Sequence, residues 1–212
     1  MERNLTIATK QKIGSARKIR EPVENMLVSI GKKDDIPDCY KHTPIEKLLL
    51  YHNLNYPFGS YSNAEMLIVM CIDNRMKLHL PDNFSYIVRN GGAKINTVLF
   101  PLSFIVATTG AKTVAVIGHS DCRMRDLETH RLGFINGLTE QGWTKKRAET
   151  FFVEMKSSFA IKDVAGSVLA DARTLRSRYS NLLVAPLYYS VEDKKLYRIK
   201  EDNRKNKINK RG

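Results

Sequence analysis

The chain of 212 residues has few cysteines and no long apolar run, and each shortage excludes a class of protein. No stretch approaches the roughly 20 apolar residues that cross a bilayer, so no membrane-spanning helix is predicted. The three cysteines are odd in number and widely spaced, and no secretory signal precedes them. They therefore predict reduced thiols, available as metal ligands, rather than a disulfide framework.

Acidic residues are also in short supply, with 22 Asp plus Glu against 35 Lys plus Arg and a formal net charge of +13. Taken alone, this excess indicates an anionic partner such as nucleic acid or a membrane surface. Most of it lies at the two ends, because residues 1–20 carry +5 and residues 200–212 carry +4. The 179 residues between them carry only +4. A role for the basic ends in binding an anionic partner stays open.

The charge distribution divides the chain into three regions. We expect a basic, partly helical N-terminal extension at 1–40, an α/β domain at 41–199 and a basic disordered tail at 200–212, which has almost no apolar residue to bury. Because no signal-peptide apolar segment is present, the expected location is cytoplasmic. The basic, acid-poor start leaves targeting to an organelle open.

Short apolar runs alternate with helical patterns along the central region. Continuous apolar runs of strand length predict buried parallel strands at 66–71, 86–89 and 113–118. A further strand at 182–191 should turn into an edge hairpin that ends at 196–199. Helices are expected from Pro44 onward after the N-cap Thr43, at 96–109 with Pro101 near the first turn, and at 123–131, 144–158 and 162–179. The alternation predicts an α/β fold with a mainly parallel central sheet flanked by helices.

Two of these strands end in residues with metal-binding chemistry. The sequence C-I-D-N-R follows the first strand at 71–75, and G-H-S-D-C follows the third at 118–122. Ligands of parallel α/β sheets bind beyond the C-terminal ends of the strands. Two thiolates and one imidazole form the protein part of an open zinc site, so Cys71, His119 and Cys122 are the candidate ligands of a Zn²⁺ ion.

Asp73 and Arg75 strengthen the interpretation as a metal site, because a neighbouring arginine keeps a carboxylate ionised beside a metal. Each candidate also has a structural interpretation: an inert buried thiol at Cys71, a hydrogen-bonded histidine at His119, or a local salt bridge at 73–75. The joint position of both motifs at strand ends favours the metal site. Two other histidines, His52 and His79, are expected at the surface.

Three motifs together resemble the signatures of the β-class carbonic anhydrases. They are C-x-D-x-R at 71–75, V-R-N-G-G at 88–92 and G-H-S-D-C at 118–122, and the wider similarity, over about residues 43–191, is to the compact archaeal-type branch of that family. The resemblance implies that fold. It also implies hydration of carbon dioxide to bicarbonate by a metal-bound hydroxide and assembly as a homodimer or larger homo-oligomer.

For the site, the resemblance implies Zn²⁺ bound by Cys71, His119 and Cys122, with Asp73 and Arg75 as the catalytic pair beside the metal. The same family branch includes hydrolases of carbonyl sulfide and carbon disulfide, which leaves the small-molecule substrate open. A catalytically silent zinc-binding module with basic tails is the alternative from another class.

The chain departs from the family pattern after the second cysteine, where Arg123 replaces the usual glycine. A backbone conformation that suits glycine would be strained by arginine. We therefore expect strain at Arg123 and an altered electric field near the metal.

Overall fold

The computed structural model describes residues 25–201, so the expectations for residues 1–24 and 202–212 lie outside the described part of the chain. One sheet has the strand order β1-β6-β5-β4-β2-β3. Its parallel strands are β2 (Met66–Cys71), β3 (Ser85–Asn90), β4 (Thr113–His119) and β5 (Leu183–Tyr189), and its antiparallel strands are β6 (Leu196–Ile199) and β1 (Leu27–Val28). The α/β fold with a mainly parallel sheet is confirmed. The strand expected at 86–89 forms as β3, but the expectation that it is buried is wrong, because β3 lies at the edge of the sheet and none of its residues is buried.

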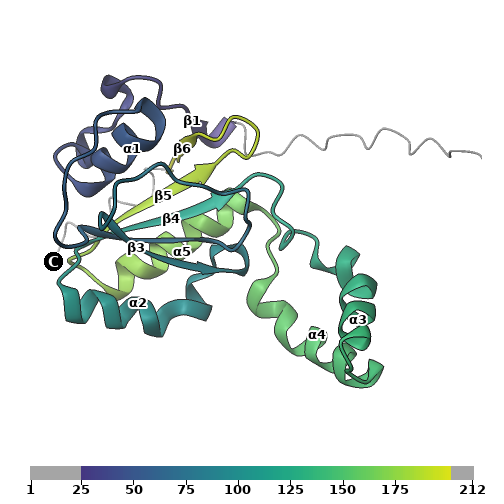
Figure 1. The fold of residues 1–212 in the computed structure, drawn as a ribbon. Coiled ribbons are helices and arrows are strands. Elements are labelled where there is room, and N and C mark those ends of the chain that lie inside the picture. Colours follow the sequence, from purple (N-terminus) through teal and green to yellow (C-terminus); the bar gives the residue numbers. More distant parts are fainter. Residues whose placement is uncertain (1–24, 202–212) are drawn as a thin grey trace, which may run out of the picture.

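The neighbouring strands β2 and β4, which end in the predicted metal ligands Cys71 and His119, are buried along their full length. Every residue of β2 and of β4 is buried. Helix α1 (Pro44–Leu54) covers one face of the sheet, and α2 (Ile95–Thr109) and α5 (Val164–Arg178) cover the other (Figure 1). Strands covered on both faces are apolar throughout, which is why the sequence predicts them well.

Local signals place the ends of α1 and α2. The Thr43 hydroxyl accepts a hydrogen bond from the Ile45 N–H at 3.2 Å and caps α1 as expected. Helix α2 is interrupted at Val98 (φ −125°). Pro101 therefore lies in the first turn after the interruption, where its missing N–H costs no helical hydrogen bond. Gly110, with φ +72°, ends the helix.

The helix expected at 123–131 is wrong. Only a 3-10 turn, Leu127–His130, forms there, and helix α3 (Arg131–Glu140) follows it. The segment is held as a loop because the Ile161 N–H donates to the Met124 carbonyl at 3.0 Å, so that carbonyl is engaged by a distant segment instead of by a helix. The helices expected at 144–158 and 162–179 are confirmed as α4 (Lys145–Phe159) and α5.

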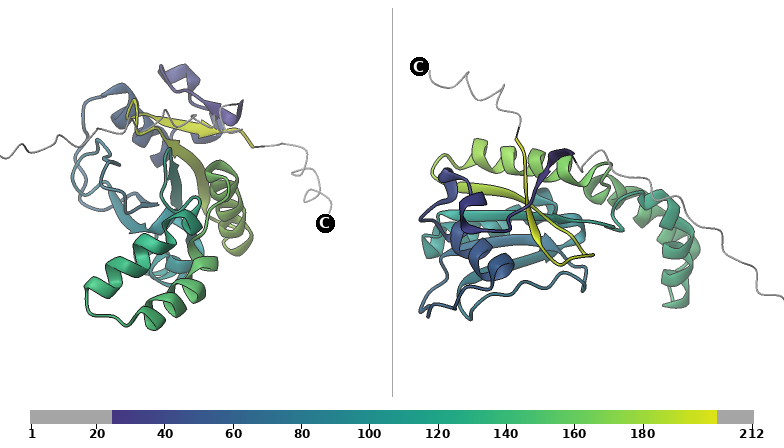
Figure 2. Two further views of the ribbon diagram at one scale, coloured as in Figure 1. Left: turned by 90° about the vertical axis from the view of Figure 1, so that its right-hand side faces the viewer. Right: turned by 90° about the horizontal axis from the view of Figure 1, so that it is seen from above.

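Helices α3 and α4 pair into a hairpin that extends away from the sheet, as Figure 1 and the right-hand view of Figure 2 show. Phe134 of α3 stacks with Phe151 of α4 at a ring-centroid distance of 6.1 Å. None of the helices between residues 25 and 201 combines the length and apolarity that crossing a bilayer requires. The α3–α4 hairpin forms an arm of the domain (Figure 1).

Residues 25–40, which the sequence analysis assigned to the N-terminal extension, share the core of the domain. Ile30, Ile36 and Tyr40 belong to the main cluster of buried apolar residues. Strand β1 pairs with β6, so β1, and not the β5–β6 hairpin, lies at this edge of the described sheet.

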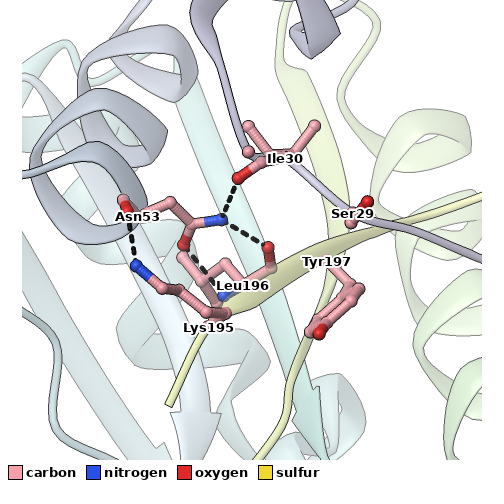
Figure 3. A pocket seen from close by; sticks show the side chains of 7 residues that line it. Ser29, Ile30, Asn53, Lys195, Leu196 and Tyr197 are labelled. Atoms are coloured by element: carbon pink, nitrogen blue, oxygen red, sulfur yellow. Dashed lines mark hydrogen bonds between the residues drawn. The ribbon is translucent and has the colours of Figure 1, made fainter. Parts of the chain in front are cut away.

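A cavity of about 280 Å³ lies where this segment meets α1 and β6 (Figure 3). Its central polar side chain is Asn53, which is 4% exposed. The Asn53 amide donates to the carbonyls of Ile30 at 3.1 Å and Leu196 at 2.7 Å, and its oxygen accepts from the Leu196 N–H at 2.9 Å. Asn53 thus links three segments that are distant in sequence.

Candidate metal centre

The structure brings the three predicted ligand residues to one place. Cys71 is the last residue of β2 and His119 the last of β4, and these neighbouring strands are parallel, so both side chains emerge at the same edge of the sheet. Cys122 follows in the turn after β4. The three ligand atoms lie within 4.8 Å of one another, with the two sulfur atoms 4.0 Å apart, and all three residues are buried.

The imidazole of His119 is oriented for coordination. Its Nδ1 donates to the Ser120 carbonyl at 2.8 Å, which leaves Nε2 as the nitrogen with a free lone pair. Nε2 is buried and has no hydrogen-bond partner among the described residues. A buried polar atom without a partner is costly, and two thiol sulfurs lie beside it. This donor set fits a metal ion that prefers sulfur and nitrogen ligands.

The two thiols differ in acidity. A hydrogen bond from Cys122 lowers the pKa of Cys71 to about 4, with the backbone N–H of Asp73 and Gly92 acting in the same direction. The hydrogen bond to Cys71 and burial raise the pKa of Cys122. Both shifts are those of two close sulfur atoms that share one proton. A bound cation would allow both to ionise.

The V-R-N-G-G motif shapes the wall of this centre. The Gly92 N–H donates to Cys71 Sγ at 3.3 Å, and Gly92 has φ +72°. This conformation favours glycine, and a Cβ atom at this position would lie 2.5 Å from Ile161 Cδ1, so a larger residue would also require the Ile161 side chain to shift. Arg89 donates to the carbonyls of Cys71 at 3.1 Å and Met76 at 2.8 Å. Sequence reasoning missed this role of Arg89, although the motif contained it.

Asp73 and Arg75 form a charged pair beside the ligand group. Arg75 Nη2 and Nε donate to Asp73 Oδ2 and Oδ1 at 2.7 and 3.0 Å, and the Arg75 backbone N–H also donates to Oδ1 at 2.9 Å. These hydrogen bonds hold the pKa of Asp73 well below its usual range. The carboxyl is therefore ionised at neutral pH.

Comparisons with known proteins agree with this architecture. No protein-family model matches the chain, and no curated protein matches its sequence. A carbonic anhydrase from Glaciozyma antarctica matches the structure with a TM-score of 0.51 and 20% identity, over 78% of this chain and 100% of that chain. The β-carbonic anhydrase isoform I from Trichomonas vaginalis matches with a TM-score of 0.52 and 16% identity, over 76% and 96%. The chain has the β-carbonic anhydrase fold.

The resemblance drawn from the three motifs is thus confirmed at the level of the fold. The apo form of a carbon disulfide hydrolase matches equally well, with a TM-score of 0.51 and 15% identity over 74% of this chain and 87% of that chain. Proteins named for two different activities, carbonic anhydrase and carbon disulfide hydrolase, therefore share this fold. The fold alone does not select between their substrates.

Two expectations for individual residues are wrong. Arg123 is exposed and is not among the residues with positive φ, so the expected backbone strain is absent there. In this β-carbonic anhydrase fold, the left-handed residue of the turn is Asp121, with φ +56°. His52, expected at the surface, is buried and accepts a hydrogen bond on Nδ1 from the His79 N–H at 3.0 Å. Burial lowers the pKa of His52 to about 4.

Proposed function

We propose that this chain is a zinc enzyme of the β-carbonic anhydrase type, which hydrates carbon dioxide to bicarbonate. Cys71, His119 and Cys122 hold the Zn²⁺ ion, and Asp73 and Arg75 act beside it. One observation carries the proposal: a buried group of two sulfurs and one unpartnered imidazole nitrogen lies next to an ionised Asp–Arg pair. Three protein ligands leave a fourth coordination position for chemistry, whereas structural zinc sites close with four.

Zinc in such a site would act as a Lewis acid and lower the pKa of a water molecule. Two thiolate ligands would make this effect weaker than three imidazole ligands do. Asp73 supplies an acceptor that orients this water. Oδ1 accepts from the Arg75 backbone N–H and from Nε, whereas Oδ2 accepts from Nη2 and only shares Nε, at 3.2 Å, so Oδ2 keeps capacity for another donor. Arg75 fixes the plane of the carboxylate and keeps it ionised, so Asp73 holds no proton of its own at neutral pH.

Asp73→Asn is expected to lower the rate of carbon dioxide hydration by about 100-fold or more, the usual range for a positioned acid–base group. The substitution preserves the shape of the side chain but removes the negative charge of the carboxylate, which accepts the hydrogen bond from the water. Stopped-flow hydration assays on zinc-loaded protein measure the effect. The matched control is Asp126→Asn, because the Asp126 side chain is exposed and pairs with Arg125 at 3.7 Å, and it should keep the wild-type rate.

The same preparations separate the alternatives. If the protein releases sulfide from carbonyl sulfide or carbon disulfide but does not hydrate carbon dioxide, its substrate is one of these sulfur analogues and not carbon dioxide. The wild-type protein could also bind zinc and yet be no more active than Asp73→Asn on carbon dioxide, carbonyl sulfide or carbon disulfide. That result would contradict the proposed enzymatic activity and favour a catalytically silent zinc-binding module.

The proposed assembly is a homodimer formed through β3 and α2. Strand β3 lies at the edge of the sheet and contains neither Pro nor Lys, two residues that commonly protect exposed edges. Ile87 on β3 is 46% exposed, and Phe100 and Phe104 on the adjacent α2 are 81% and 59% exposed. A second copy related by a two-fold axis would cover both elements.

Phe100→Glu is expected to convert the dimer to a monomer, because burying the new carboxylate at the interface is unfavourable. Size-exclusion chromatography with light scattering measures the mass. Thr174→Glu, which adds the same charge at an exposed position of α5, is the control and should leave the mass unchanged. A wild-type monomer, or a Phe100→Glu dimer, would contradict this interface.

The remaining proposals concern the extent and location of the enzyme. The zinc-binding catalytic domain is proposed to span 41–199. Residues 25–40 contribute apolar side chains to the core of this domain. A cytoplasmic location, targeting to an organelle and a role of the basic ends in binding an anionic partner stay predictions from the sequence.

A further inference from the structure

Asp121 completes a clamp around the Arg75 guanidinium. Arg75 Nη1 donates to Asp121 Oδ2 at 2.7 Å, and Nη2 donates to the Asp121 carbonyl at 3.0 Å. The same guanidinium donates from Nε and Nη2 to Asp73. Acceptors from the ends of two strands, β2 and β4, therefore fix it in position and orientation.

The backbone of Asp121 is held in place independently of Arg75. The preceding residue, Ser120, is tied to β5, since its N–H donates to the Tyr189 carbonyl at 3.0 Å and its hydroxyl accepts from the Val191 N–H at 2.8 Å. Asp121 follows with φ +56°, a conformation that only a few residue types adopt readily. The turn between His119 and Cys122 thus places the Asp121 carboxylate against Arg75, although the Asp121 side chain itself is 80% exposed.

Asp73 has two competing positive partners in the proposed enzyme, namely Arg75 and the metal. The Asp73 side chain is 14% exposed and lies beside the ligand group, whereas the Arg75 side chain is 39% exposed. An arginine with this exposure is free to leave its partner unless something else holds it. Asp121 is the group in position to do so.

We propose that Asp121 is a positioning residue, which holds Arg75 across the two loops and so keeps Asp73 paired with Arg75 instead of bound to the metal. The inference rests on the proposed function, because it needs a metal at the Cys–His–Cys group. It assigns a role to Asp121, the fourth residue of the G-H-S-D-C motif, which belongs neither to the ligand set nor to the Asp73–Arg75 pair. Without Asp121, Asp73 competes for the fourth coordination position.

The test variant is Asp121→Gly, because glycine keeps the left-handed backbone while removing the side chain. The matched control is Asp126→Gly: Asp126 also has a positive φ, of +54°, and an exposed carboxylate in the same loop. A double variant, Asp73→Asn with Asp121→Gly, removes the competing carboxylate. All are prepared as the full chain loaded with Co²⁺, whose visible absorption reports its coordination.

Azide is then titrated into each protein, and its affinity for the fourth position is read from the Co²⁺ spectrum. Asp121→Gly should bind azide about threefold or more weakly than wild type, an effect scaled to a partly exposed ion pair. Asp126→Gly should match the wild type. In the double variant the Asp121→Gly effect should disappear, since no Asp73 carboxylate is left to compete.

Equal azide affinity in wild type and Asp121→Gly would overturn the inference while leaving the proposed function intact. So would an equal loss in Asp126→Gly, which would show general loosening of the loop, or a loss that persists in the double variant. If wild-type protein binds Co²⁺ without thiolate-to-metal charge-transfer absorption, the proposed metal site fails, and this inference fails with it.

Discussion

His119→Ala is expected to reduce Zn²⁺ affinity by more than about 100-fold, which exceeds the usual cost of losing only an outer partner of a metal ligand. The variant removes the one nitrogen donor of the group, whose Nε2 has no other partner among the described residues. It also removes the hydrogen bond from Nδ1 to the Ser120 carbonyl at 2.8 Å, which orients the ring. Two thiols 4.0 Å apart remain and supply too few ligands for a stable site.

Competition with a chelating indicator measures this affinity, and His130→Ala is the matched control. His130 lies in the turn before α3, and its side chain is exposed. Its replacement should leave Zn²⁺ binding unchanged. If His119→Ala binds zinc as tightly as wild type, the metal is held elsewhere, and the proposed function falls with the site.

The sequence predicts this centre because the relevant strands are simple to recognise. Strands β2 and β4 are buried throughout, so their apolar runs show where each strand ends. Parallel strands place those ends at one edge, and Cys71 and His119 follow as neighbours without knowledge of any side-chain contact. The spacing to Cys122 is local, within one turn.

Contacts between segments that are distant in sequence could not be predicted from local sequence patterns. The helix expected at 123–131 fails because the Met124 carbonyl is bound by Ile161, a contact that no local propensity encodes. Strand β1 has only two residues and thus no periodic pattern to detect. The roles of Arg89 and Asp121 depend on how closely loops from different strands approach, which only the folded chain shows.

Asn53→Ala is expected to lower the free energy of unfolding by about 3 kcal/mol, because it leaves buried backbone groups without partners. Three hydrogen bonds, of 2.7, 2.9 and 3.1 Å, join this side chain to the backbone of Leu196 and Ile30. The loss would loosen β6 and the segment that contributes Ile30 to the core, as their convergence on Asn53 indicates (Figure 3). Urea denaturation followed by circular dichroism measures the change.

The control is Asn63→Ala, since Asn63 is exposed and its side chain makes a hydrogen bond of 3.4 Å to Ser62. Its replacement should change stability by no more than about 0.5 kcal/mol, as is usual at the surface. A similarly small change for Asn53→Ala would mean that water replaces all three hydrogen bonds within the cavity. In that case residues 25–40 would be held to the domain by the pairing of β1 with β6 and by the apolar contacts of Ile30, Ile36 and Tyr40.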